Sequence, residues 1–344
     1  MRVLDFAFLG TLALAVGFHA PAGAEEFKMQ EVPSLPAVAA GALPPHTILF
    51  TDHHKDELFD PITGLIHFAD WERSRSAQKQ LLSLYPSYQE PTVTTTDEAG
   101  SKTRKRRLHV YVAEARFALA RPAAATDLSK MVTLAMVEQF DPSIKHRLIS
   151  AADAIPNKDA SLPNHNPGRQ WCEGAQPMIC IQSKYQLEGR LPTGIMLVNK
   201  IRENHKKIAD YIEFQSELRL VPQAEIDQAA LAQATGINTP VAGVVEQNIF
   251  WINQIMQFGK FLAVLQPDPA DPKRSVATTF VALAVDSDLF EKKKDLETVP
   301  ILRNLVPAQV LAGNSSFNTG NSISGGLPKY SRNRIQAIAG LLEK

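Results

Sequence analysis

The sequence of 344 residues has no excess of charge of either sign, because 36 Lys and Arg side chains balance 36 Asp and Glu side chains. A chain without net charge creates no overall field that attracts nucleic acid or an anionic membrane. We therefore expect no nucleic-acid partner. Beyond its N-terminal segment, the chain also lacks any apolar run of the roughly 18 residues that a membrane-spanning helix needs. No transmembrane segment is expected in the mature protein.

Motifs of catalysis and cofactor binding are missing as well. The chain has no G-x-S-x-G turn for a serine nucleophile, no H-E-x-x-H pair for zinc, and no G-x-G-x-x-G or G-x-x-x-x-G-K loop for phosphate. We therefore predict no cofactor and no particular catalytic residue, and we favour binding over catalysis. A hydrolase whose site is assembled only by the fold stays open as the alternative. Its candidate general bases are His109, His146, His165 and His205.

The first 24 residues have the pattern of a removable signal peptide. Arg2 supplies a positive charge, residues 6–18 form an apolar core, and small side chains at residues 22–24 suit a signal peptidase. The alternative is an uncut membrane anchor, but the apolar core is short for one. We predict that residues 1–24 are removed and that the protein is periplasmic or secreted.

The chain has two cysteines, Cys172 and Cys180. In an oxidising compartment, an even pair close in sequence indicates a disulfide, and Gly174 and Pro177 allow the chain to turn between them. A redox or metal-binding pair is the alternative, although a metal would need further ligands. We predict a Cys172–Cys180 disulfide.

Composition divides the mature chain into two regions. Residues 25–46 are rich in Ala and Pro, which is typical of a flexible lead-in. Residues 47–344 have globular composition and predict one large domain, or two with a boundary near 156–170, where Asn, Pro and Asp are frequent.

Strands are indicated by alternation of apolar and polar side chains. The pattern is clear at residues 108–119, 179–190 and 211–220, and it favours an antiparallel sheet with one buried and one wet face. Two longer strands are predicted at 248–265 and 276–286, joined by an exposed turn.

Helices are predicted where apolar side chains recur at helical spacing, at residues 126–140, 223–234 and 330–342. Ser331 is the expected N-cap of the last of these. The predicted fold class is α+β: a mostly antiparallel, one-sided sheet with flanking helices and a C-terminal helix.

Three polar segments are candidates for binding chemistry. A weak metal site is suggested by imidazole and carboxylate groups at Asp52, His53, His54 and His67, for which a solvated loop is the alternative. The basic block at residues 102–107 is expected to be an exposed loop, with contact to a polyanion as the alternative. Residues 313–326, rich in Gly, Asn and Ser, are expected to form an ordinary connection, an anion-binding nest or a lid.

An apolar ligand site is the remaining candidate, because a sheet closed by a helix can enclose a pocket. The side chains proposed to line it are Phe250, Trp251, Met256, Phe258 and Phe261, with a filled core as the alternative. The sequence therefore predicts an exported protein that binds an unknown ligand or envelope partner.

Overall fold

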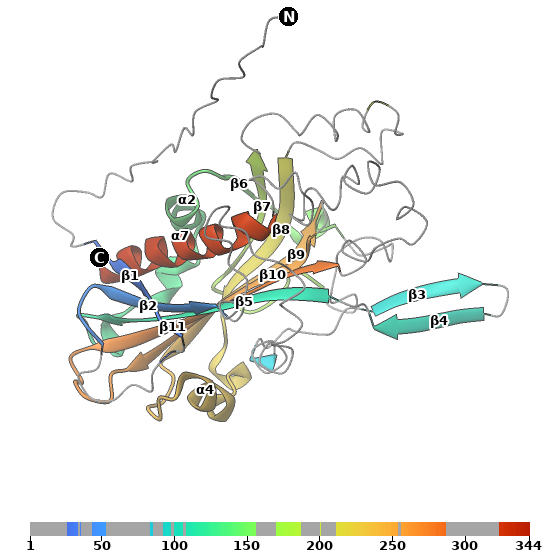
Figure 1. The fold of residues 1–344 in the computed structure, drawn as a ribbon. Coiled ribbons are helices and arrows are strands. Elements are labelled where there is room, and N and C mark those ends of the chain that lie inside the picture. Colours follow the sequence, from blue (N-terminus) through green and yellow to red (C-terminus); the bar gives the residue numbers. More distant parts are fainter. Residues whose placement is uncertain are drawn as a thin grey trace, which may run out of the picture.

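A computed structural model gives the fold of the chain (Figure 1). It describes residues 26–33, 35, 43–52, 83–84, 92–97, 100–105, 108–155, 170–186, 200, 211–253, 256–286 and 323–344.

The main element is a nine-stranded sheet with the strand order β1-β2-β5-β11-β10-β9-β8-β7-β6. Its strands are β1 (Lys28–Glu31), β2 (Thr47–Asp52), β5 (Leu108–Leu119), β6 (Lys145–Leu148), β7 (Met178–Gln186), β8 (Tyr211–Leu220), β9 (Gly243–Ile252), β10 (Met256–Pro267) and β11 (Ser275–Asp286). All neighbours are antiparallel except β1 and β2. Strands from both sides of residues 156–170 enter this one sheet, so a boundary there does not divide it.

Helices cover both faces of the sheet. The long C-terminal helix α7 (Ile323–Glu343) lies across one face, here called the inner face, and α4 (Gln228–Thr235) packs on the opposite, outer face (Figure 1). The short helix α2 (Leu134–Phe140) contacts α7 and β6. The predicted mostly antiparallel sheet with a C-terminal helix is therefore confirmed, with few helices beside it.

The inner face carries the larger hydrophobic core. Aromatic side chains of β2, β5 and β10, namely Phe50, Phe117 and Phe261, are buried there, and α7 contributes Ile335 and Leu342. Those helix residues recur at the spacing that keeps one helical face against a sheet. Burial of this apolar area is the main force that holds α7 in place.

The outer face is buried too, so the prediction of a one-sided sheet is wrong for the described strands. Phe258 and Phe280 pack there with Leu231 of α4. Farther along the same face, the polar side chains of Glu217, Arg219, Glu246, Asn248 and Lys260 are also buried. Alternation of apolar and polar residues looks the same whether the polar face meets water or other polar groups, and this is why the pattern misled.

Several predicted boundaries change in the structure. Residues 248–265 form parts of two strands, because the chain reverses after Ile252 and β10 pairs back on β9. The predicted helix at 126–140 divides into a 3₁₀ turn capped by Asp127 and α2 capped by Thr133. α7 begins well before residue 330, so Ser331 lies fully buried inside the helix rather than at its N-cap.

Two segments that the sequence predicts to be irregular also contain strands: the lead-in at residues 25–46 and the basic block at residues 102–107. Within the predicted flexible lead-in, β1 pairs with β2, and Phe27 packs edge-on against Phe117 with ring centroids 5.6 Å apart. A flexible lead-in therefore does not describe residues 27–31. The basic block is largely strand β4 (Gly100–Lys105), paired with β3 (Thr92–Asp97) in a separate hairpin rather than forming a loop.

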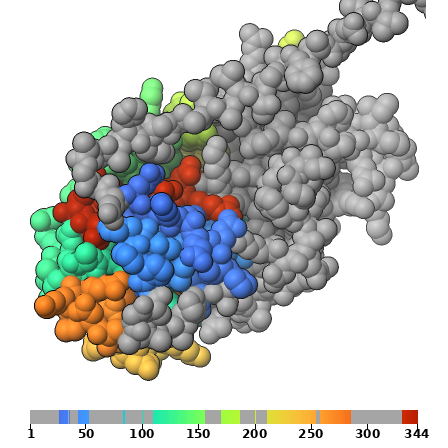
Figure 2. All heavy atoms as spheres, turned by 60° about the vertical axis from the view of Figure 1, so that its left-hand side comes forward, coloured from blue at the N-terminus to red at the C-terminus, as the bar shows by residue number. Residues whose placement is uncertain are grey.

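The N-terminal strands β1 and β2 lie between α7 and the β10–β11 end of the sheet, as the blue, red and orange atoms in Figure 2 show. Gln336 donates a hydrogen bond of 2.9 Å to the Phe27 carbonyl, and Arg274 donates one of 3.2 Å to the Leu43 carbonyl. In the described part of the chain, no helix combines the length and apolarity required to cross a membrane.

The predicted disulfide between Cys172 and Cys180 is confirmed, with Cα atoms 5.6 Å apart. Cys180 lies on β7, and the backbone N–H of Cys172 donates to the Glu217 carboxylate of β8 at 3.0 Å. Next to it, Trp171 stacks on Phe250 with ring centroids 4.7 Å apart. The cross-link thus ties the segment before β7 onto the sheet beside buried Glu217.

Candidate functional site

A cavity lies between α7 and the inner face of the sheet, and we call it the inner cavity. Its volume is about 50 Å³. The lining is mostly apolar and includes Phe140, Leu218, Phe261, Ile335 and Leu342. Three polar side chains interrupt this lining: Gln247, Thr279 and Arg334.

Arg334 is the unusual member of this lining, because only 2% of its surface is exposed. Its Nη1 is hydrogen-bonded to the Asp141 carboxylate and, at 2.8 Å, to the Tyr330 hydroxyl, and its Nη2 is hydrogen-bonded to the Gln247 carbonyl oxygen. The guanidinium carbon lies 4.2 Å from the centre of the Phe261 ring. Aromatic faces attract a desolvated cation, so this contact adds to the ion pair.

The charge of Arg334 is maintained by its partners. Burial alone would lower its pKa, but the Asp141 carboxylate and the Tyr330 hydroxyl outweigh that effect and raise the pKa of Arg334. Burial also raises the pKa of Tyr330 well above its ordinary value, so Tyr330 keeps its proton. The wall of the inner cavity therefore holds a compensated cation beside a neutral phenol.

Two polar atoms in this lining have no hydrogen-bond partner. One is Nε of Arg334, and the other is the hydroxyl oxygen of Thr279, a residue that is 4% exposed. Thr279 lies on the inner face of β11, between the core residues Ala277 and Val281. Buried polar groups are normally paired, so two unpaired ones in the same cavity need an explanation.

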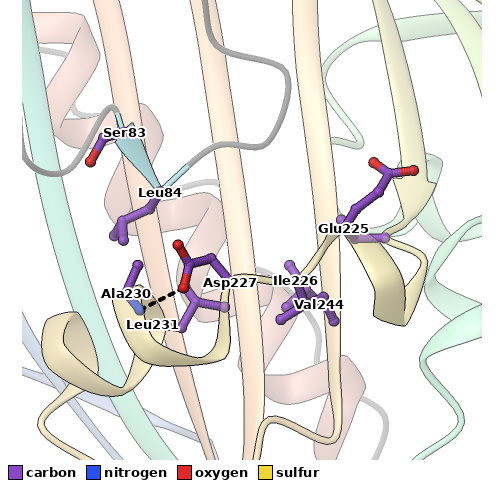
Figure 3. Close-up of a pocket in the computed structure, with 9 residues that line it drawn as sticks. Ser83, Leu84, Glu225, Ile226, Asp227, Ala230, Leu231 and Val244 are labelled. Atoms are coloured by element: carbon purple, nitrogen blue, oxygen red, sulfur yellow. Dashed lines mark hydrogen bonds between the residues drawn. The ribbon is translucent and has the colours of Figure 1, made fainter.

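A second cavity, of about 60 Å³, lies on the outer face beside α4 (Figure 3). Its polar groups are already engaged. Asp227 accepts a hydrogen bond of 3.0 Å from the N–H of Ala230 and caps α4, as the dashed line in Figure 3 marks. Glu225 pairs with Arg219 at 2.8 Å. The outer cavity therefore offers apolar contact without an unpaired polar group among the residues that line it.

A histidine–serine contact lies near the Arg334 cluster. Nδ1 of His146 is 2.8 Å from the Ser183 hydroxyl oxygen, and Nε2 is 3.3 Å from the Asp141 backbone carbonyl. Ser183 is 1% exposed, and neither residue lines the inner or the outer cavity. The pair resembles a base next to a nucleophile, but a substrate has no route to the hydroxyl through either cavity.

His146 should make stability depend on pH. Burial lowers the pKa of His146, and contacts with Asp141 only partly oppose this. The unfolded chain, with a histidine pKa of about 6.5, then binds a proton more readily than the folded chain, so stability present above that pH is lost as the pH falls through the folded pKa. From about pH 7.5 to about pH 5.5, urea denaturation should show a larger loss of unfolding free energy for the wild type than for His146→Gln. Equal losses in the two proteins would contradict this assignment.

Of the four candidate metal ligands predicted from sequence, the structure describes only Asp52. His53, His54 and His67 lie outside the described residues, as do residues 313–322 of the Gly-, Asn- and Ser-rich segment, and residues 323–326 belong to α7. Asp52 is buried on β2, where it accepts hydrogen bonds from Tyr111 and Arg332 at 3.3 and 3.4 Å. Within the described ranges, no group of three His, Cys, Asp or Glu residues is placed to hold a metal ion.

Of the five side chains proposed to line an apolar pocket, Phe261 lines the inner cavity. Phe258 points to the outer face, and Phe250 is buried against Trp171. Trp251, on β9, lines neither cavity, and the side chain of Met256 is outside the described part. Arg334, Asp141 and Thr279 were not among the sequence candidates. For Arg334 the sequence offers one weak signal, which is its position directly before Ile335, a member of the apolar stripe of the closing helix.

No protein-family model matches the sequence, and no curated protein matches it. Solved structures with some similarity include the ZhuI aromatase/cyclase from Streptomyces sp. R1128, with 13% identity and a TM-score of 0.33 over 68% of this chain and 92% of that one. Another is the human StAR-related lipid transfer protein 5, with 7% identity and a TM-score of 0.29 over 80% and 99%. A third is Ara h 8.0201, with 9% identity and a TM-score of 0.31 over 69% and 98%. With scores this low, nothing about the function of this chain follows from them.

Proposed function

We propose that this protein is an exported, non-catalytic binding protein that takes a small, mainly apolar ligand into the inner cavity. The observation that carries the proposal is the cavity itself, which lies between α7 and the sheet and is lined mainly by apolar side chains. Small-molecule sites in proteins are typically concave and apolar with a few placed polar groups, and this lining has that composition.

Binding is favoured over hydrolysis by the position of the polar groups. The contact between His146 and Ser183 supports a hydrolase as the second candidate. Against it, the serine hydroxyl belongs to a residue that is 1% exposed, and an attacking oxygen must approach a substrate within about 3 Å. Binding of a ligand in the apolar cavity does not require a nucleophile to reach it.

Export is supported by two independent features. The N-terminal 24 residues have signal-peptide composition, and Cys172 and Cys180 are joined in a disulfide. Disulfides persist in oxidising compartments such as the periplasm or the extracellular space. The proposed location is therefore periplasmic or secreted.

Native mass spectrometry of the protein recovered from the exported fraction of its producing cells tests the proposal. The expected mass is that of a disulfide-bonded chain beginning at Glu25, together with a small adduct that is lost on collisional activation. Ala263→Leu fills the inner cavity, whose wall includes Ala263, and should remove the adduct. The matched control Ala230→Leu fills the outer cavity and should keep it. A wild-type protein without any adduct, or an adduct retained in Ala263→Leu, would contradict binding in the inner cavity.

A further inference from the structure

We propose that the ligand of the inner cavity is a small, neutral molecule that places a carbonyl oxygen between the Thr279 hydroxyl and Nε of Arg334. This inference rests on the proposed function and adds the chemistry of the ligand. It starts from the two unpaired polar atoms, both of which belong to side chains more than nine-tenths buried.

An acceptor oxygen is the group that each of the two atoms can pair with, and both residues line the same cavity. Nε of an arginine can only donate a hydrogen bond, and a threonine hydroxyl can donate one. A carbonyl oxygen has two lone pairs and can accept from both. A hydrocarbon of the same shape would enclose the two donors without pairing them, which costs free energy.

Charge compensation argues for a neutral ligand. The cation of Arg334 already pairs with Asp141, and its guanidinium lies near the rings of Phe140 and Phe261 at 4.6 and 4.2 Å. A carboxylate ligand would bring a second negative charge to a cation that is already neutralised, inside a mostly apolar lining. Burying a charge without its own partner is strongly unfavourable.

The size of the cavity limits the ligand. One water molecule needs on the order of 10–15 Å³ of such space, so the inner cavity of about 50 Å³ holds the equivalent of a few waters. A ring of five or six carbon atoms, or the carbonyl end of a longer molecule, is therefore the expected occupant, with α7 adjusting around it.

A matched pair of probes tests this chemistry. Cyclohexanone and methylenecyclohexane have nearly the same shape, but the first carries C=O where the second carries C=CH₂. Dissociation constants are measured by protein-detected NMR titration. We expect the wild type to bind cyclohexanone about tenfold more tightly, since one or two net hydrogen bonds have that effect. Cyclohexanecarboxylate should bind more weakly than cyclohexanone.

Variants assign the preference to the cavity wall. Thr279→Val removes the hydroxyl at nearly constant volume and should weaken cyclohexanone binding about three- to tenfold while leaving methylenecyclohexane unchanged. Thr278→Val is the matched control, because the Thr278 hydroxyl instead accepts from Arg116 Nε at 3.2 Å; it should keep the wild-type preference. If Thr279→Val does not fold, Thr279→Ser, which keeps the hydroxyl, should also keep the preference.

The outcomes separate this inference from the proposed function. If both probes bind wild type with equal affinity, or if Thr279→Val weakens both equally, the carbonyl inference is overturned and ligand binding stands. Tighter binding of the carboxylate overturns the neutral-ligand part. If neither hydrocarbon nor ketone binds, the inner cavity is not a ligand site, and the proposed function fails together with this inference.

Discussion

Replacing Arg334 by methionine should lower the free energy of unfolding by about 3–5 kcal/mol, the usual cost of removing one partner of a buried ion pair. The substitution preserves most of the side-chain volume, so the loss comes from charge rather than from a cavity. Asp141, which is 5% exposed, would remain in an apolar setting without its cation. Gln247 and Tyr330 would each lose a hydrogen-bond donor as well. Urea denaturation at neutral pH measures the effect.

Two further variants make this prediction specific. In Arg334→Met combined with Asp141→Asn, the stranded charge is gone, so the double variant should be more stable than Arg334→Met alone. Arg332→Met, on the same helix, is the matched control. Its side chain is 28% exposed and pairs with the more exposed Glu31 as well as with Asp52, so a smaller loss is expected. A loss below about 1 kcal/mol in Arg334→Met would show that the pair does not hold α7 to the C-terminal end of α2, where Asp141 lies.

The strands of this fold were predictable where apolar and polar side chains alternate over many residues. β5 and β8 begin and end where the alternation predicts, because one face of each carries large apolar side chains and a shift by one residue would move all of them to the opposite face of the sheet. The stripe of Ile335 and Leu342 likewise predicts the closing helix, and the short spacing between Cys172 and Cys180 predicts the disulfide.

The cavity wall was not predictable, because its polar members come from distant parts of the chain. Arg334 and Asp141 are separated by 193 positions, and neither has a local pattern that marks it as buried. Thr279 sits in an apolar strand where a threonine is ordinary. β1 was not predicted either, because its four residues have no strand pattern of their own and become a strand by pairing with β2.

The outer face shows a related limit, because the charges predicted to meet water are buried and paired. Arg219 is at the centre of this group. Its guanidinium lies 3.0 Å from the Glu246 carboxylate, 2.8 Å from that of Glu225 and 3.9 Å from that of Glu217. The side chains of Glu217 and Glu246 have no exposed surface, so both depend on nearby cations and donors for compensation. These charges compensate one another because the pairing of β8 with β9 places Arg219 opposite Glu246.

Arg219→Met should therefore be strongly destabilising, by about 3–5 kcal/mol, because it removes the cation that three carboxylates share while two of them, Glu217 and Glu246, stay buried. Glu225, with 44% of its side chain exposed, can turn to solvent, so most of the cost should come from Glu246. Accordingly, adding Glu246→Gln to Arg219→Met should recover part of the loss, whereas adding Glu225→Gln should recover little. Denaturant unfolding of the four proteins measures each step.

A matched control distinguishes this effect from the removal of any arginine. Arg274 also faces a buried carboxylate, that of Asp268, but at 3.8 Å and with 27% of the arginine side chain exposed. Water can replace that cation, so Arg274→Met should cost much less, within the range of about 0–1 kcal/mol that exposed pairs contribute. If both arginine variants lost the same stability, the buried charges of Glu217 and Glu246 would have to be compensated by other groups, and Arg219 would be one peripheral contact among several. A loss confined to Arg219→Met would instead mean that the outer face is held together by its charges as much as by its apolar contacts.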